Sequence, residues 1–138
     1  MHILHLYKDY FPVLGGIENH IRVLAEAQAA AGHRVTVLVC APGWHTRTEA
    51  VNGVLVIRAG RLTTRASMPI SLAQPWQLLG QRADIVHVHS PYPLGELANW
   101  LTRRGRATVI THHSDVVRQQ AWLRLYAPLL RRVLGAAD

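Results

Sequence analysis

The first 39 residues, MHILHLYKDYFPVLGGIENHIRVLAEAQAAAGHRVTVLV, decide the fold expected for this chain. Residues 2–6 form a short apolar run, and residues 17–31 carry apolar side chains at the three- and four-residue spacings of an amphipathic helix. Gly32 follows as a suitable left-handed stop for that helix. Residues 34–39 are apolar on both faces, as in a sheet covered by helices on both sides. This order predicts a parallel strand–helix–strand unit.

The same alternation continues along the rest of the chain. Further strands are expected at residues 54–58, 84–89 and 107–111, and further helices at residues 71–81, 94–104 and 119–134. Proline, glycine and polar residues predict loops at residues 41–52 and 60–69. The fold class expected is therefore α/β, with a Rossmann-like, doubly wound, mainly parallel sheet and helices on both of its faces.

Length and composition indicate one globular domain over residues 1–138. Of the 138 residues, 49% are hydrophobic and 17% charged, and no apolar run approaches the ~20 residues of a membrane-spanning helix. The start of the chain lacks the pattern of a signal peptide. Cys40 is the single cysteine, so an intrachain disulfide is excluded. These features are compatible with the cytoplasm.

Arginine supplies nearly all of the net charge of +7, because Lys8 is the only lysine. Such a surface attracts anions, among them acidic lipid head groups and phosphorylated substrates. The alternative is a solvated basic face without a partner. No nucleic-acid-binding signature accompanies the charge, so no nucleic acid is expected as a partner.

Three segments of unusual composition follow the carboxyl ends of predicted strands. They are Gly15-Gly16, His89-Ser90 and residues 112–115. Ligands of open α/β sheets bind beyond these strand ends, near the point where the strand order reverses. If the first, fourth and fifth of the predicted strands are neighbours, one crevice collects all three segments.

Gly15 and Gly16 precede the first predicted helix. Two glycines let the backbone approach a ligand closely, and the free N–H groups of a helix start attract phosphate or carboxylate. The alternative is a tight turn with no ligand. The spacing excludes both the Gly-x-Gly-x-x-Gly dinucleotide fingerprint and the phosphate-binding P-loop.

Histidines cluster at the ends of the later strands. His87 and His89 are two residues apart on one strand and therefore face the same side, whereas the adjacent His112 and His113 point in opposite directions. At most one of that pair can join His89, and even with Asp115 the set is incomplete for a metal, so none is expected. His87 is expected to be a hydrogen-bonded core residue. His113, at a strand end, is the better candidate for ligand contact.

Other candidates for chemistry are few. Arg58, Arg61 and Arg65, near the end of the third predicted strand, could hold an anionic acceptor, or they could be solvated loop residues. Ser90 and Ser114 lack the context of a nucleophile elbow. No pair of carboxylates is placed for glycosidase-type acid and base catalysis.

Four blocks of the sequence, taken together, resemble family 4 retaining glycosyltransferases of the GT-B fold. Residues 11–20 (FPVLGGIENH) resemble the family's P-x-x-G-G opening, and residues 30–38 (AAGHRVTVL) are similar to its second strand. Residues 84–91 (DIVHVHSP) and 109–115 (VITHHSD) look like two later family segments. The blocks occur in the family order and cover nearly the whole chain.

The resemblance implies roles for individual residues. Gly15 and Gly16 match the loop that meets the donor pyrophosphate and the acceptor, and Glu18 matches a position on the acceptor side. His113 matches the histidine that contacts the donor sugar near the reacting carbon. Such enzymes transfer a sugar from a nucleotide-diphosphate sugar with retention, without a metal. Many act on lipid or polysaccharide acceptors at the cytoplasmic face of the membrane, so a cytoplasmic protein with peripheral contact to that face is expected.

The resemblance also implies what a complete enzyme adds. The family holds the donor nucleotide mainly in a C-terminal domain, with an Arg/Lys pair and an E-x7-E segment that cannot be assigned here. The N-terminal domain normally continues with another strand beyond Asp138. The chain is therefore expected to be a truncated N-terminal, acceptor-side half of a GT-B fold, inactive alone. The alternatives are a non-catalytic Rossmann-like module that binds a ligand or partner, and an anion-binding domain of unrelated chemistry, such as a flavodoxin-like one.

Overall fold

The computed structural model describes residues 1–65, 67–113, 127–128, 131–132 and 135. The strands of its main sheet are β1 (His2–Leu6), β2 (Arg34–Cys40), β3 (Arg47–Val51), β4 (Val54–Ala59), β7 (Ala83–Ser90) and β8 (Gly105–His112). Its helices are α1 (Gly16–Ala30), α2 (Ala73–Leu79) and α3 (Pro93–Thr102), and a small second sheet contains β5 (Thr63–Arg65) and β6 (Met68–Ile70). None of the described helices is both long and apolar enough to cross a membrane.

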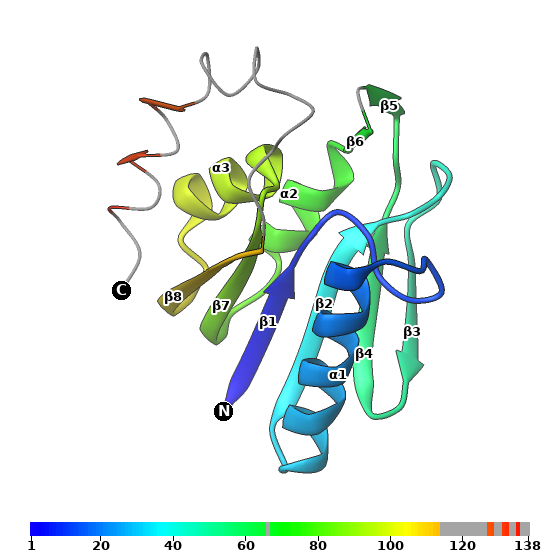
Figure 1. Cartoon of the computed structure of the whole chain (residues 1–138), viewed down its shortest axis with the longest axis vertical. Coiled ribbons are helices and arrows are strands. Elements are labelled where there is room, and N and C mark those ends of the chain that lie inside the picture. The colour runs from blue at the N-terminus through cyan, green and yellow to red at the C-terminus, as the bar shows by residue number, and fades with distance from the viewer. Residues whose placement is uncertain (66, 114–126, 129–130, 133–134, 136–138) are drawn as a thin grey trace.

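The main sheet has six strands in the order β3-β4-β2-β1-β7-β8 (Figure 1). All neighbouring strands are parallel except β3, which pairs antiparallel with β4. This confirms the expected α/β fold with a mainly parallel, Rossmann-like sheet. It also confirms the expected neighbours at its centre, because β1 lies between β2 and β7, and β7 lies beside β8.

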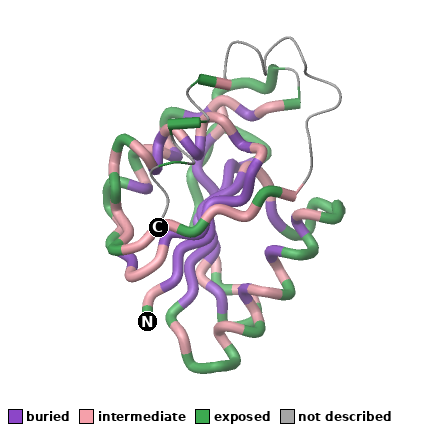
Figure 2. The backbone as a smooth tube through the Cα atoms, turned by 60° about the vertical axis from the view of Figure 1, so that its left-hand side comes forward, coloured by how far each residue is buried: buried purple, intermediate pink, exposed green. Residues whose placement is uncertain are grey.

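Helices cover both faces of the sheet, with α1 on one side and α2 and α3 on the other (Figure 1). The strands between them form the buried centre of the chain (Figure 2). Val35, Val37 and Val39 of β2 pack with Ile21 of α1, whereas Leu38 packs in the cluster on the opposite face. The apolar pattern on both sides of β2 is therefore explained by two separate hydrophobic clusters.

Gly32 follows the end of α1, as the sequence predicts. Gly32 adopts a φ of +88°, a left-handed conformation that a side chain would disfavour. The backbone N–H of His33 donates to the carbonyl of Gln28 at 3.1 Å, which satisfies one of the last free carbonyls of the helix. The turn leads directly into β2, as expected.

Two of the expected loops contain strands. Residues 41–52 include β3, which forms a hairpin with β4 through Asn52 and Gly53, both at positive φ. An Asn-Gly pair is a strong hairpin signal, but the strand before it is largely polar because it lies at the sheet edge. Residues 60–69 include β5 and most of β6. The helix expected at residues 119–134 lies mostly outside the described residues.

Candidate functional site

The described parts of the three segments expected to meet lie at one end of the sheet. His20, in the first turns of α1, has its ring centroid 4.9 Å from that of His113 and 6.1 Å from that of His89. The backbone N–H of His113 donates to the carbonyl of Ser90 at 3.0 Å, which continues the pairing of β7 and β8. The start of α1 therefore lies beside the carboxyl ends of these strands. Asp115, also expected at this edge, lies outside the described residues.

A histidine chain (His5, His89 and His113) runs from α1 to the end of the sheet. Gln28 Oε1 of α1 lies 2.7 Å from His5 Nε2, and His5 Nδ1 lies 2.9 Å from His89 Nε2. His89 Nδ1 in turn lies 2.9 Å from His113 Nε2. The chain links a helix, two strands and a strand end by consecutive hydrogen bonds.

The position of each proton in the histidine chain follows from its first member. A carbonyl oxygen only accepts, so His5 Nε2–H donates to Gln28 and His5 Nδ1 carries the lone pair. His89 Nε2–H therefore donates to His5, and His113 Nε2–H donates to His89 Nδ1. In the neutral state His113 is left with an acceptor lone pair at Nδ1.

Burial favours the neutral form of these rings. Desolvation lowers the pKa of His5 and of His89, whose side chains are fully buried, and neighbouring histidines lower the pKa of His89 further. Desolvation, with His5 as the next cause, lowers the pKa of His87 to about 4, and desolvation also lowers the pKa of His113. Each neutral ring offers one donor and one acceptor, as the alternating hydrogen bonds require.

His87 and His112 are placed as the strand pattern predicts. His87 is buried, and its Nε2 lies 2.7 Å from Thr111 Oγ1, which confirms a hydrogen-bonded core histidine. His112 points away from His113, and its Nδ1 lies 3.2 Å from Ser90 Oγ. Ser90 itself is buried, so its hydroxyl helps to hold the strand ends together.

Gly15 and Gly16 have different surroundings. A Cβ added to Gly15 would lie 2.1 Å from Glu18 Oε2, whereas one added to Gly16 would meet nothing within 4 Å. The largely buried Glu18 thus places its carboxylate over Gly15, at the positive end of the α1 dipole. Gly15 makes room for an internal carboxylate, while Gly16 leaves space in which a ligand could approach.

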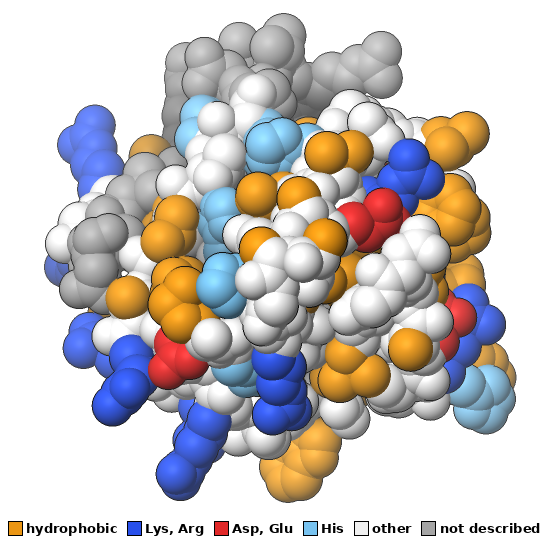
Figure 3. All heavy atoms as spheres, turned by 90° about the horizontal axis from the view of Figure 1, so that it is seen from below, with side chains coloured by type: hydrophobic (Ala, Val, Ile, Leu, Met, Phe, Trp, Pro, Cys, Tyr) orange, Lys and Arg blue, Asp and Glu red, His pale blue; other side chains and the backbone are white. Residues whose placement is uncertain are grey.

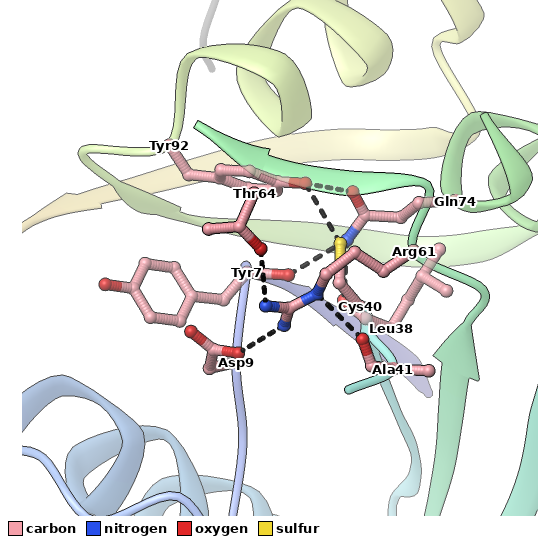
Figure 4. A network of polar contacts seen from close by, with 9 residues as sticks. All are labelled: Tyr7, Asp9, Leu38, Cys40, Ala41, Arg61, Thr64, Gln74 and Tyr92. Carbon is pink, nitrogen blue, oxygen red and sulfur yellow. Dashed lines mark hydrogen bonds and ion pairs between the residues drawn. The ribbon is translucent and has the colours of Figure 1, made fainter. Parts of the chain in front are cut away.

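Arg61 holds loops together at the carboxyl end of the sheet (Figure 4). Its guanidinium donates to the carbonyl of Ala41 at 2.8 Å, to Thr64 Oγ1 at 3.1 Å and to Asp9 Oδ1 at 3.1 Å. Arg65 is exposed on β5. Of the two arginines predicted for the acceptor side, Arg65 is therefore more open to solvent.

Arg58 anchors the loop that leads to Gly15. It is buried at the end of β4, where Nε donates to Glu49 Oε1 at 2.6 Å and Nη2 donates to the carbonyl of Phe11. The Arg58 side chain is therefore occupied by internal partners. It ties Phe11, in the loop before Gly15, to β4 and to Glu49 of the edge strand β3.

Gln74 of α2 contacts β2 and the segments that follow β1 and β7 (Figure 4). Its Nε2 donates to the carbonyl of Tyr7 at 2.9 Å and approaches that of Leu38 at 3.5 Å, and its Oε1 accepts from the hydroxyl of Tyr92. Cys40 Sγ lies 3.5 Å from that same hydroxyl, and burial raises the pKa of the Cys40 thiol. One amide thus fixes the segments that follow β1 and β7.

Arginines gather at the opposite end of the sheet, where the parallel strands begin. This end has a pocket of about 410 Å³, which is lined by His2, Arg82, Ala83, Asp84, Arg103, Arg104, Gly105 and Arg106. Arginine side chains cluster on one side of this end (Figure 3). The basic patch and the histidine chain therefore occupy opposite ends of β7 and β8.

The strand pattern missed three members of the site: His5, His20 and Gln28. His5 could be recognised only from its position along β1. In the pairing of β1 with β7, His5 lies beside His87, and it therefore shares a face of the sheet with His87 and His89. His20 and Gln28 are two helical turns apart on α1, on the side that packs against this face. Neither signal can be used before the strand register and helix placement are known.

A mainly parallel α/β sheet with polar groups gathered beyond its strand ends defines a Rossmann-like domain. More specifically, the chain belongs to Glycosyltransferase Family 4, whose sequence model matches residues 14–138. This confirms the resemblance drawn from the sequence motifs.

Two curated relatives align over the whole of this chain. One is the D-rhamnosyltransferase WbpZ of Pseudomonas aeruginosa, 36% identical over 141 aligned residues that make up 37% of that protein. Another is the O-antigen chain mannosyltransferase C of Escherichia coli, 34% identical over 141 aligned residues that make up 38% of it. The chain spans a little over a third of the length of these relatives.

Proposed function

We propose that this chain is the acceptor-side domain of a retaining hexosyltransferase that transfers sugar from a nucleotide-diphosphate sugar to a lipid-linked or polysaccharide acceptor. The observation that supports it most strongly is that His89 and His113 lie beside the start of α1, at the carboxyl end of the sheet, in a family 4 chain. This is where open α/β sheets bind their ligands.

His113 is proposed to contact the donor sugar near the reacting carbon. Its ring is only partly buried, and its Nε2–H is held by His89, so Nδ1 remains to accept a hydrogen bond from a sugar hydroxyl. His89 acts as a positioning residue, because it fixes the orientation and tautomer of the His113 ring. Ser90 supports the same edge through His112.

The start of α1 is proposed to meet the donor pyrophosphate. The space around Gly16 and the free N–H groups of the first helical turn suit an anion. Glu18 lies on the acceptor side of this turn, and its carboxylate can accept a hydrogen bond from an acceptor hydroxyl. A phosphate that approached Gly15 would have to displace this carboxylate, so Gly16 is the proposed point of approach.

The acceptor is proposed to be a lipid-linked glycan or a polysaccharide, and one of the relatives is an O-antigen chain mannosyltransferase. Arg61 and Arg65 lie on the proposed acceptor side, and the net charge of +7 favours peripheral contact with an anionic membrane from the cytoplasm. A mannose- or rhamnose-type donor is proposed from the names of both relatives.

The test uses a full-length polypeptide that contains this chain and donors bearing mannose and rhamnose. We expect release of nucleoside diphosphate with formation of a product that keeps the anomeric configuration of the donor. His113→Ala should reduce kcat/KM by about 100- to 1,000-fold while leaving the melting temperature nearly unchanged. The exposed His45→Ala serves as a matched control and should retain activity. Equal loss of folding and turnover in His113→Ala would assign the ring a core role instead.

A second test addresses the isolated chain. The proposal places most donor contacts in a second domain, so the purified 138-residue chain should release no nucleoside diphosphate in the steady state from a panel of donors. Sustained release would show that this chain alone is catalytic. Restored transfer on mixing it with a separately produced second domain would support the proposal that the second domain supplies most donor contacts. It would also disfavour a non-catalytic binding module.

A further inference from the structure

We propose that the pocket of about 410 Å³ in the basic patch, at the amino ends of β7 and β8, binds a phosphate group. Its arginines come from two turns: Arg82 directly precedes β7, and Arg103 and Arg104 directly precede β8. The histidine chain lies at the opposite ends of these strands. The inference therefore goes beyond the proposed transfer reaction, and phosphate binding in this pocket does not depend on that reaction.

The pocket has an excess of positive charge. Its charged lining consists of four arginines and one aspartate, which are Arg82, Arg103, Arg104, Arg106 and Asp84. Four positive side chains and one negative side chain leave a formal charge of +3. Asp84 is already engaged, because Oδ2 accepts a hydrogen bond from the backbone N–H of His2 at 2.7 Å and Oδ1 lies 3.6 Å from Arg106 Nη1. Among the described residues, no carboxylate forms an ion pair with the other three arginines. This charge favours an anionic ligand.

Hydrogen bonds hold the walls of the pocket in place. The backbone N–H of Ala83 donates to the carbonyl of Arg104 at 3.1 Å, which joins the two turns. His2 Nδ1–H donates to the carbonyl of Arg82 at 2.7 Å, and His2 Nε2 lies 2.9 Å from Thr36 Oγ1. A ligand thus meets a backbone that is already ordered, so little conformational entropy opposes binding.

Arg104 and Arg103 each have a feature that the packing of the chain does not explain. Arg104 Nε is buried and has no hydrogen-bond partner within the described residues. Such an orphaned donor is costly, and a bound ion or water is a common reason for one. Arg103 has φ and ψ of 44° and 56°, a left-handed conformation that favours glycine over arginine. Strain of this kind is concentrated at functional sites.

The chemistry and the size of the pocket both suit a phosphate group. A guanidinium presents its N–H donors as a planar fork that matches two phosphate oxygens, and the charge of a phosphate can engage several arginines. The volume lies within the range of about 300–1,000 Å³ typical of small-molecule sites, so there is also room for the group that carries the phosphate.

Helix ends offer a competing role for some of these side chains. Arg82 follows the end of α2 and Arg103 follows the end of α3, where positive charge stabilises the negative end of the helix dipole. That role requires no phosphate, and it predicts that loss of either arginine lowers the melting temperature. It does not explain Arg106, which lines the same pocket from within β8.

The experiment titrates the nitrogen-15-labelled chain with inorganic phosphate at constant ionic strength and follows the backbone amides by NMR. We expect saturable shifts at residues 82–84 and 103–106. Arg82→Gln and Arg103→Gly should each weaken phosphate binding about fivefold, and the double variant more than about tenfold. Arg103→Gly should not lower the melting temperature measured without phosphate, because glycine readily adopts the left-handed conformation. Arg34→Gln, an exposed arginine at the amino end of β2 and outside the pocket, is the matched control.

A second arm distinguishes the two sources of a phosphate group, a lipid head group and a soluble phosphate compound. Vesicles of phosphatidylglycerol test the first source and glycerol 3-phosphate tests the second, with phosphatidylcholine vesicles as the reference without net charge. Vesicle binding that the double variant loses and Arg34→Gln keeps would assign the pocket to a lipid head group. The same dependence for glycerol 3-phosphate, without vesicle binding, would assign it to a soluble compound. Either result supports the site.

Four results would overturn the proposal. The first is the absence of saturable binding to any of these probes, and the second is equal weakening by Arg34→Gln, which would indicate diffuse positive charge instead of a site. The third is a set of amide shifts confined to residues 15–17, which would place the phosphate at the start of α1. The fourth is a lower melting temperature of Arg82→Gln with unchanged phosphate binding, which would assign the arginine to the helix end.

Discussion

His89 Nδ1 accepts a hydrogen bond from His113 Nε2–H at 2.9 Å, while the opposite nitrogen of His89 donates to His5. The ring of His89 is fully buried, whereas His113 is only partly so. The partly exposed His113 is thus oriented by the buried His89. The proton positions of both rings are set by Gln28, at the other end of the histidine chain.

The buried histidines make the fold sensitive to acid. The pKa of His87 is lowered from 6.5 to about 4, so below about pH 6.5 the unfolded chain takes up a proton that the folded chain does not. The contribution of His87 to the free energy of unfolding is therefore fully present above pH 6.5. It falls by on the order of 3 kcal/mol as the pH approaches 4. Urea unfolding across this pH range, with a chelator present, measures the loss.

Substitution tests the assignment of this acid sensitivity. His87→Gln should make the free energy of unfolding depend less steeply on pH between 6.5 and 4, whatever its effect at neutral pH. His45→Gln, at an exposed position, should leave the slope unchanged. Identical slopes for His87→Gln and the unchanged chain would mean that His87 does not titrate as its burial predicts.

The direction of the histidine chain can be tested at Gln28. Gln28→Glu supplies a group that only accepts, so His5, His89 and His113 should all keep the proton on Nε2. Gln28→Leu removes the acceptor and should leave a mixture of tautomers. Nitrogen-15 NMR of the imidazole rings distinguishes the two forms. A proton on Nδ1 of His89 in the unchanged chain would contradict the deduced order.

Gln74→Leu should destabilise the fold by about 1–3 kcal/mol, because the hydroxyl of Tyr92 and the carbonyl of Tyr7 each lose their hydrogen bond to the buried amide. Gln77→Leu, one turn further along α2 and partly exposed, is the matched control. Chemical denaturation of both variants gives the comparison. Similar stabilities would show that the amide of Gln74 is dispensable.

A pair of glycines tests the close packing near the loop after β2. A Cβ at Gly60 would lie 2.0 Å from the carbonyl oxygen of Trp44, whereas one at Gly43 would meet nothing within 4 Å. Gly60→Ala should therefore lower the melting temperature, with a loss of about 1–3 kcal/mol, because the backbone of residues 43–46 must shift. Gly43→Ala should be nearly neutral. The reverse order of melting temperatures would refute the packing of this loop.

Much of the fold could be predicted because its signals are local. The apolar periodicity of β1, α1 and β2, together with Gly32, gives the strand–helix–strand unit directly. The edge strand β3 was missed because an exposed strand has little apolar patterning, and its identity depends on pairing with β4.

The site could be predicted only in part for a related reason. Parity along β7 and at the end of β8 correctly separated His113 from His112, because that inference needs only neighbouring residues. The contribution of His5 and His20 depends on strand register and on the position of α1, which no local pattern specifies. The internal partners of Arg61 were hidden for the same reason, since Ala41 and Asp9 are distant in sequence.

The single amide of Gln74 has a mechanical consequence. Since it holds the carbonyl of Tyr7 after β1 and the hydroxyl of Tyr92 after β7, these two segments cannot shift independently without breaking a buried hydrogen bond. A ligand that displaced one would pull on the other through α2. Rearrangement at this end of the sheet should therefore be collective, with the loops responding as one unit rather than as separate flaps.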